Sequence, residues 1–152
     1  MASVHDVAAA ILERTGPIDT FKLQKLAYYC QAWHLVWDEE PLFKARIEAW
    51  ANGPVVRALY DKHRGSYRVS DWRWGDAREL TKSERGTVAA VVKYYNKYEG
   101  FQLAELTHRE APWRDARANV GLGPGERGEV VISQTAMRIY YEGLLGTPGT
   151  SR

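Results

Sequence analysis

The sequence predicts a mainly α-helical fold: a compact helical domain around a buried central helix at about residues 20–37, with a small two- or three-stranded β element. Apolar residues recur at helical spacing along most of the chain. The segment 20–37 is apolar on nearly every side, which is typical of a helix buried in a core. Residues 43–50 instead alternate between apolar and polar side chains, which is typical of a half-buried strand.

Length and composition fit one globular domain. The 152 residues are 45% hydrophobic and 26% charged, and a chain of this length buries roughly two-thirds of its unfolded surface. We therefore expect one domain over residues 1–145 that needs no disulfide or metal, followed by a disordered tail at 146–152. The single cysteine excludes an intramolecular disulfide and a Cys-x-x-Cys metal site.

The first two helices have clear start signals. Ser3 suits the N-cap of a helix over 4–14, which Gly16 and Pro17 end. Asp19 or the residue after it caps the central helix. The apolar stripe of that central helix is formed by Leu23, Leu26, Ala27, Cys30, Trp33 and Trp37.

The strand at 43–50 ends at a Gly-Pro pair. Pro54 suits the first turn of a helix, where its missing N–H needs no partner, so we expect a helix from there to about residue 63. The strand needs a partner, because buried backbone N–H and C=O groups must be hydrogen-bonded. The segments 67–74 and 129–132 are the two candidates.

The second half of the chain predicts three further helical regions. Thr81 and Glu84 form a capping box before a helix that we expect to end at Gly100. The elements that follow are two short helices within 101–118 with a turn at Ala111-Pro112, a glycine-rich loop over 119–128, a short strand at 130–132 and a last helix capped by Ser133.

The sequence holds no complete catalytic or metal-binding motif. Residues 123–130 match G-x-G-x-x-G-x-V, but they lack the preceding strand and the later lysine of nucleotide-binding loops, so we expect a flexible loop. The enzymatic alternative uses Cys30 with His34 or His108 as base, or His108 with Glu110. Cys30 lies on an apolar stripe, where cysteine usually behaves as a small hydrophobic residue, so we expect no enzyme. The histidines form no metal-binding motif with one another or with Cys30, so we also expect no metal and no cofactor.

Tryptophan and tyrosine supply fifteen of the eighteen aromatic residues. Such amphipathic rings are enriched at protein interfaces. Trp72 and Trp74 flank Arg73 in a segment with weak core periodicity, which predicts an exposed cluster of contact residues. The alternative is that these rings cap the helical core.

Charge and hydropathy bear on possible partners. The net charge of +2 is too small to predict nucleic-acid binding, although a small nucleic-acid-binding regulator that uses the basic region 57–85 is an alternative. The longest uncharged apolar run, 26–37, is too short to cross a bilayer, which takes about 20 residues. The N-terminus has no signal-peptide pattern, so we expect a soluble cytoplasmic protein.

Three segments stand out by their order and spacing. They read KLQKLAYYCQAWHL over 22–35, IEAWANGPVV over 47–56 followed by Tyr60, and LTHREAPW over 106–113. Together they resemble the Panacea antitoxin domain family, also described as SocA-like or GepA-like and often phage-associated. The resemblance runs from about residue 4 to residue 143.

The resemblance implies a mostly helical domain that neutralises a toxin encoded nearby by direct protein contact, with no catalytic residues. Some family members act as proteolytic adaptors that deliver the toxin to a AAA+ protease, which is the alternative mode. The motif residues expected to hold the fold are Leu23, Leu26, Trp33, Gly53, Pro54, Thr107, His108 and Trp113. The residues expected to be exposed toxin contacts are Lys25, Tyr29, Trp50, Arg57, Trp72, Arg73 and Trp74.

Overall fold

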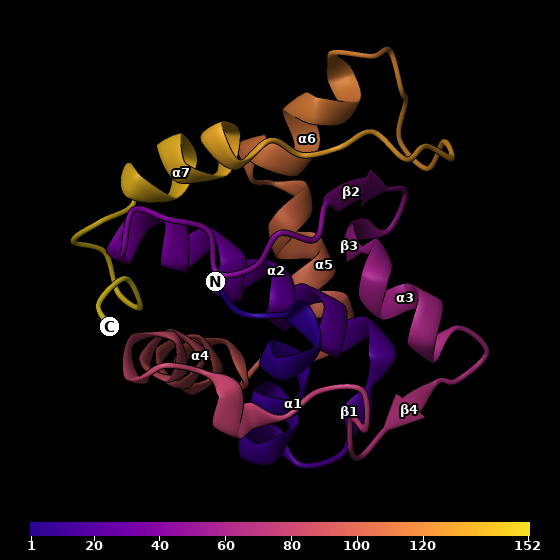
Figure 1. The fold of residues 1–152 in the computed structure, drawn as a ribbon. Helices are drawn as coiled ribbons and strands as arrows, with labels where there is room; N and C mark the ends of the chain where they lie inside the picture. Colours follow the sequence, from indigo (N-terminus) through magenta and orange to yellow (C-terminus); the bar gives the residue numbers. More distant parts are fainter.

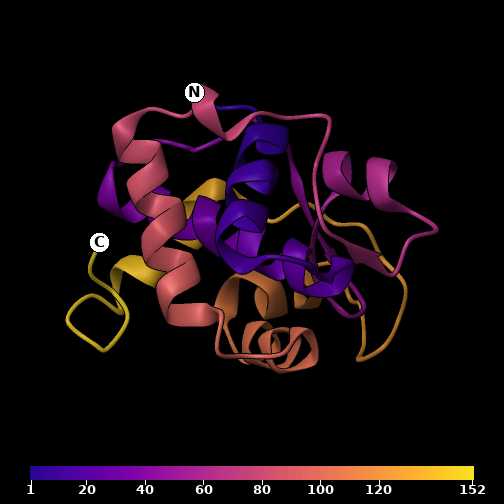
Figure 2. The ribbon, with the colours of Figure 1, turned by 90° about the horizontal axis from the view of Figure 1, so that it is seen from below.

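The computed structural model describes residues 1–152 and is mainly helical, which confirms the predicted fold class (Figure 1). Helix α2 (Thr20–Trp37) runs through the centre of seven α-helices. It is contacted by α1 (Val4–Thr15), α4 (Lys82–Tyr95), α5 (Gly100–His108) and α7 (Gln134–Glu142). Figure 2, a view from below, shows α1 and α4 side by side in front of α2, and these two helices also contact each other.

Two small antiparallel sheets complete the fold. The first pairs β1 (Ile18–Asp19) with β4 (Arg68–Val69), and the second is a hairpin of β2 (Ile47–Trp50) and β3 (Gly53–Val56). The remaining elements are α3 (Arg57–His63), which follows β3 directly, a single 3-10 turn at Ala77–Glu79, and α6 (Ala111–Ala118).

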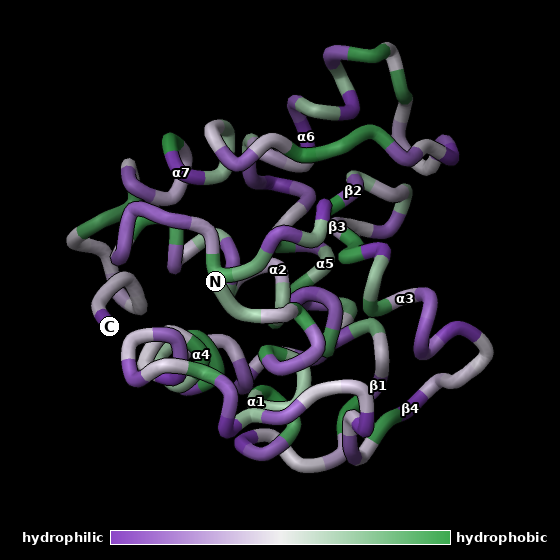
Figure 3. The backbone as a smooth tube through the Cα atoms, viewed as in Figure 1, coloured by the Kyte–Doolittle hydropathy of each residue, from purple (hydrophilic) through white to green (hydrophobic).

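Helix α2 is buried on all its sides. Every residue from Lys22 to Leu35 is buried, and the Asp19 side chain caps the helix by accepting from the Lys22 N–H at 2.7 Å. Figure 3 shows hydrophilic segments on the outer turns of the fold, and a hydrophobic stretch leads into α7. None of the helices combines enough length with enough apolar residues to cross a bilayer.

Two buried glutamines of α2 hold neighbouring segments by their backbones. The Gln31 side chain accepts from the Leu42 N–H at 2.8 Å and donates to the Phe43 carbonyl at 2.8 Å. The Gln24 side chain accepts from the Val56 N–H at 2.7 Å and donates to the Val56 carbonyl at 3.2 Å. Because buried polar groups need partners, the Gln31 pair fixes the segment before β2 against α2, and the Gln24 pair fixes the end of β3.

The predicted boundaries around the hairpin are wrong. The strand begins at Ile47 rather than at residue 43, and the Gly-Pro segment predicted to start a helix is instead the partner strand β3. Gly53 has φ +124°, a conformation that favours glycine and lets the chain reverse after β2. Helix α3 therefore begins only at Arg57.

Only one of the two segments predicted to pair with this strand does so. The segment 129–132 does add to β2, because the Ala49 N–H donates to the Val130 carbonyl at 2.7 Å and the Ile132 N–H to the Ile47 carbonyl at 2.8 Å. The other candidate, 67–74, supplies β4 and pairs with β1.

Gly100 does not end the helix before it, as the sequence suggested, but is the first residue of α5. A Cβ atom at Gly100 would lie 2.9 Å from Asp19 Oδ1 and 3.1 Å from the Lys22 backbone nitrogen. The glycine is therefore explained by the close approach of α5 to the start of α2. The capping box of Thr81 and Glu84 at the start of α4 is confirmed.

Residues 146–152, expected to be disordered, pack against α2 and α4. The Trp37 indole N–H donates to the Thr150 carbonyl at 2.9 Å, and the Arg152 guanidinium lies 2.6 Å from the Asp38 carboxylate. The expectation followed from the usual disorder of chain ends that nothing holds in place, whereas Thr150 and Arg152 hold this one.

Trp33 tests the central position of α2. Its side chain is 1% exposed, and its indole N–H donates to the Tyr95 hydroxyl at 2.9 Å. Trp33→Ala leaves a cavity and an unpaired hydroxyl, so we expect the free energy of unfolding to fall by about 3–5 kcal/mol in urea melts. Tyr67→Ala, at a side chain that is 79% exposed, is the control and should change it by less than about 0.5 kcal/mol. A loss under about 1 kcal/mol for Trp33→Ala would contradict the central burial of α2.

Candidate functional site

Five aromatic rings lie in a continuous row along the hairpin, α3 and the loop after β4. Trp50 contacts Tyr60 with ring centroids 4.8 Å apart, and Tyr60 contacts His63 at 5.6 Å. His63 contacts Trp72 at 6.3 Å, and Trp72 contacts Trp74 at 5.0 Å. We call these five residues the aromatic face.

Basic side chains lie over the rings of the aromatic face. A cation above an aromatic ring is attracted by the negative face of the ring. Each such cation also adds positive charge to a surface of partly buried rings. The pairs are Arg57 over Trp50, Arg64 over Tyr60, and both Arg73 and Lys62 over Trp74, with the cations 5.0–6.0 Å from the ring centroids.

The structure brings five of the seven predicted contact residues to this face, namely Trp50, Arg57, Trp72, Arg73 and Trp74. Trp74 is 39% exposed, but Trp72 is buried, so the prediction that it is exposed is wrong. The Trp72 indole N–H donates to a ring nitrogen of His5 in α1 at 3.1 Å. This ring therefore ties the loop to the core, and its neighbour Trp74 is the one that reaches solvent.

Tyr29 was expected to be exposed and is fully buried. Its ring stacks on Tyr95 with centroids 4.1 Å apart, and its hydroxyl donates to the Glu110 carboxylate at 2.7 Å. The prediction assumed that the Tyr29 hydroxyl faces solvent, as it does on a surface helix. Helix α2 has no side that faces solvent, so the prediction is wrong.

The Glu110 carboxylate ties α2 to α7. It accepts a second hydrogen bond from the Tyr141 hydroxyl at 2.8 Å, and Tyr141 in turn lies 3.0 Å from the Tyr28 hydroxyl. Burial raises the pKa of Glu110, while the two tyrosine hydrogen bonds act in the opposite direction. The sequence analysis did not single out Tyr141, because no pattern in the sequence distinguishes it from the adjacent Tyr140.

The catalytic pairs considered from the sequence are not assembled. Burial raises the pKa of the Cys30 thiol, whereas a nucleophilic cysteine needs a lowered pKa. His34 is hydrogen-bonded to Thr87 at 2.8 Å and its other ring nitrogen lies 3.5 Å from Asp38. The Glu110 carboxylate is bonded to tyrosines rather than to a histidine.

One group of side chains has the spacing of metal ligands. His34, Asp38 and Glu40 offer ligand atoms that lie within 4.8 Å of one another. The Asp38 carboxylate already binds the Arg152 guanidinium at 2.6 Å and the Ser83 hydroxyl. The Asp38 carboxylate therefore holds the C-terminal tail in place through Arg152.

A pocket of about 760 Å³ opens where the hairpin, α3 and residues 127–129 meet the start of α2. Its volume is in the range of small-molecule sites. Phe21, Trp50 and Tyr60 give it aromatic walls, and Lys25 lies among the residues that line it. We call it the Lys25 pocket.

Lys25 was expected to be exposed but is completely buried, with its ammonium 4.0 Å from the centroid of the Phe21 ring. The ammonium has no hydrogen-bond partner. Burial lowers the pKa of Lys25 to about 7, and the negative charge of Asp19 opposes this shift. A Cβ atom at Gly53 would lie 2.5 Å from Lys25 Cε, so the hairpin glycine also makes room for this side chain.

The third motif packs beneath the hairpin. The Trp113 indole N–H donates to the Trp50 carbonyl at 2.8 Å, and the His108 ring stacks on Trp113 with centroids 4.0 Å apart. The Thr107 hydroxyl is buried and donates back to the Ala104 carbonyl at 2.7 Å within α5. The third motif thus packs against the hairpin and is hydrogen-bonded to it through Trp113.

The chain matches a family model described as antitoxin SocA-like, Panacea domain, over residues 23–114. The chain belongs to this family. The matched segment of the Panacea domain begins in α2 and ends in α6, so it contains the whole aromatic face and most of the Lys25 pocket. No curated protein and no solved structure matches the chain.

The titration of Lys25 gives a pH-dependent prediction for the Panacea domain. Between pH 7 and the ordinary lysine pKa of 10.5, the unfolded chain binds more protons than the folded chain, so stability rises with pH. Lys25→Met removes a buried charge, so we expect it to raise the free energy of unfolding at pH 6 by on the order of 3–5 kcal/mol.

The gain from Lys25→Met should nearly vanish at pH 10, where the lysine is neutral in the folded state. Urea melts at the two pH values measure it, with Lys93→Met on the exposed side of α4 as control. An equal effect of Lys25→Met at both pH values would show that the ammonium is not held in an apolar site.

Proposed function

We propose that this protein is an antitoxin that neutralises a toxin protein by direct contact. Membership of the SocA-like Panacea antitoxin family is the observation that carries the proposal. The structure supplies what such a binder needs, because its buried helix α2 and the hydrogen bonds around it form a rigid platform.

We further propose that the toxin binds at the aromatic face, with Trp74 and Arg73 as central contacts. Tryptophan, tyrosine and arginine dominate the residues that contribute most to protein interfaces. Trp74 is 39% exposed with the Arg73 guanidinium 5.0 Å from its ring centroid, and Tyr67 nearby in the sequence is 79% exposed. A stable complex buries roughly 800 Å² per partner, so the contact must extend over α3 as well.

An apolar groove of about 420 Å³ between α6 and α7 is the alternative surface. Val120, Val131 and Ile139 line it and are exposed. These three residues lie beyond the segment 23–114 that carries the family match, whereas the aromatic face lies within that segment. This difference favours the aromatic face.

The same face also has the composition of a single-stranded nucleic-acid site, because cations lie over its aromatic rings. Such binding would weaken steeply as the salt concentration rises. A titration with single-stranded oligonucleotides at low and high salt tests this second candidate, and no binding at low salt removes it.

Growth of cells that produce the protein of the adjacent reading frame, with and without this chain, tests the proposed function. We expect growth arrest by the neighbour alone, relief by co-production, and a complex that co-purifies. Relief with loss of the toxin and no complex would indicate delivery to a protease instead. A toxin that stays active in the presence of this chain would contradict the proposal.

Paired variants test the surface. We expect Arg73→Glu combined with Trp74→Ala to weaken toxin binding at least about tenfold in calorimetry, since it removes a central ring and reverses a charge. Val131→Ser combined with Ile139→Ser in the groove is the matched control and should bind normally. The reverse outcome, with both pairs folded, would move the toxin site to the groove between α6 and α7.

A further inference from the structure

We propose that the Lys25 pocket binds a small organic anion, a compound that carries a phosphate or carboxylate group beside a planar ring. The pocket shares Trp50, Tyr60 and His63 with the aromatic face, but the inference rests on the pocket's own residues, above all Lys25, and not on the proposed toxin contact. Trp74 and Arg73 do not line that cavity.

Basic residues outnumber acidic ones in the lining of the pocket. Lys25, Arg57, Arg64 and Arg127 line it, and Glu129 is the one acidic residue among the lining residues. Arg57 lies 3.4–3.6 Å from the carboxylates of Glu48, Asp61 and Glu129, so its charge is already opposed. Neither Arg64 nor Arg127 forms an ion pair. An incoming anion therefore meets two arginines that have no carboxylate partner of their own.

Lys25 is the strongest indication of a missing partner. Buried polar atoms are nearly always hydrogen-bonded, and an unsatisfied one calls for an explanation such as a bound ion. Gln24 and Gln31 on the same helix each bond a backbone segment, whereas the Lys25 ammonium bonds nothing. The half-buried Phe21 ring lies over that ammonium, so a ligand that pairs with the ammonium has to displace this ring.

The walls of the pocket suit the other part of the ligand. Phe21, Trp50 and Tyr60 present aromatic surface on which a planar ring can stack. The volume of about 760 Å³ is that of a site for one small organic molecule rather than for a bare ion.

The loop that carries Arg127 is held in place by a buried arginine. Arg117 is 2% exposed, and its guanidinium donates to the Ala49 carbonyl at 2.9 Å and to the Gly123 carbonyl at 3.0 Å. The glycine-rich segment 123–130 is thereby anchored to the hairpin, and Arg127 and Glu129 reach the mouth of the pocket.

Calorimetry with four probes tests the proposal. AMP has a ring and a phosphate, benzoate has a ring and a carboxylate, adenosine has a ring without an anion, and inorganic phosphate has an anion without a ring. We expect saturable binding of AMP or benzoate with a Kd below about 1 mM, and much weaker binding of the other two. Binding of AMP identifies a phosphate ligand, and binding of benzoate a carboxylate ligand. Binding of neither overturns the proposal.

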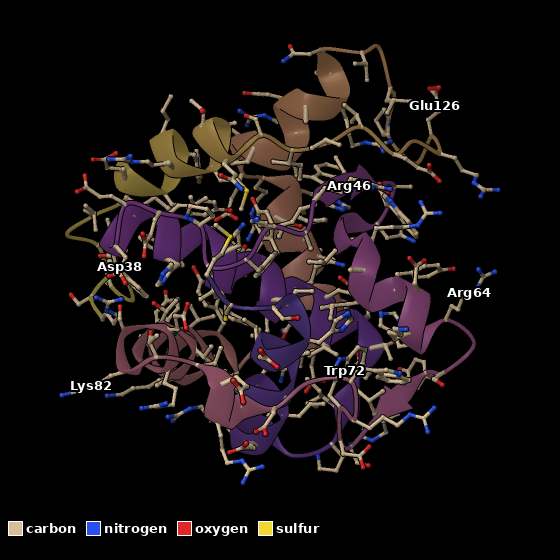
Figure 4. All side chains as sticks on the ribbon, in the orientation of Figure 1. Asp38, Arg46, Arg64, Trp72, Lys82 and Glu126 are labelled. Carbon is tan, nitrogen blue, oxygen red and sulfur yellow. The ribbon has the colours of Figure 1, made fainter.

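Variants assign the binding to this pocket. Lys25→Met should weaken it about tenfold or more, because it removes the cation that the anion pairs with. Lys82→Met removes a lysine on the opposite side of the molecule from Arg64 and should have no effect (Figure 4). Trp74→Ala should also bind normally, which separates this site from the toxin contact. Equal affinity of Lys25→Met and the unchanged chain would overturn the proposal.

Proton uptake gives a readout that a purely structural role would not move. The ionisable groups around Lys25 are Asp19 at the start of α2, His63 in α3 and His108 in α5. Burial lowers the pKa of both histidines, so they are neutral at pH 8. An anion beside Lys25 favours its charged form, so binding at pH 8 should take up about one proton in the unchanged chain and none in Lys25→Met. Identical uptake in both would contradict contact with Lys25.

Discussion

The complete burial of helix α2 is the constraint on which the rest of the structure depends. A helix covered on every side must find partners inside the protein for each of its polar side chains. Gln31 binds the backbone at residues 42–43, Gln24 binds Val56, and Tyr29 binds Glu110. These bonds hold the segment before β2, the end of β3 and the start of α6 against α2, so α2 organises the chain around it.

The position of the proposed toxin surface follows from the same arrangement. The bonds between Gln24 and Val56 fix the point where β3 becomes α3, and α3 carries the middle of the aromatic face. The hairpin turn at Gly53 leaves room for Lys25, the one buried polar side chain of α2 whose charged group has no partner. The position of the proposed toxin surface and the unsatisfied cation beside it thus both depend on one helix and the hairpin packed against it.

The sequence predicts the helices well and the site only in part. The all-round apolar pattern of 20–37 and the cap at Asp19 locate α2, because both signals are local. The strand β3 was missed because a Gly-Pro pair usually breaks structure, and its role here depends on long-range bonds to α2. Lys25 was predicted to be exposed because lysine usually is. The apolar periodicity of the sequence could not correct this, because α2 has no side that faces solvent. Trp72 and Trp74 differ only in what packs against them, which no local pattern reveals.

Hydrogen–deuterium exchange of the free chain and of its complex with the toxin tests the central claim most directly. The account predicts new protection in peptides from residues 57–75, which carry α3 and most of the aromatic face, while α2 is already protected in the free chain. Protection confined to residues 116–140, or rapid exchange of α2 in the free protein, would contradict it.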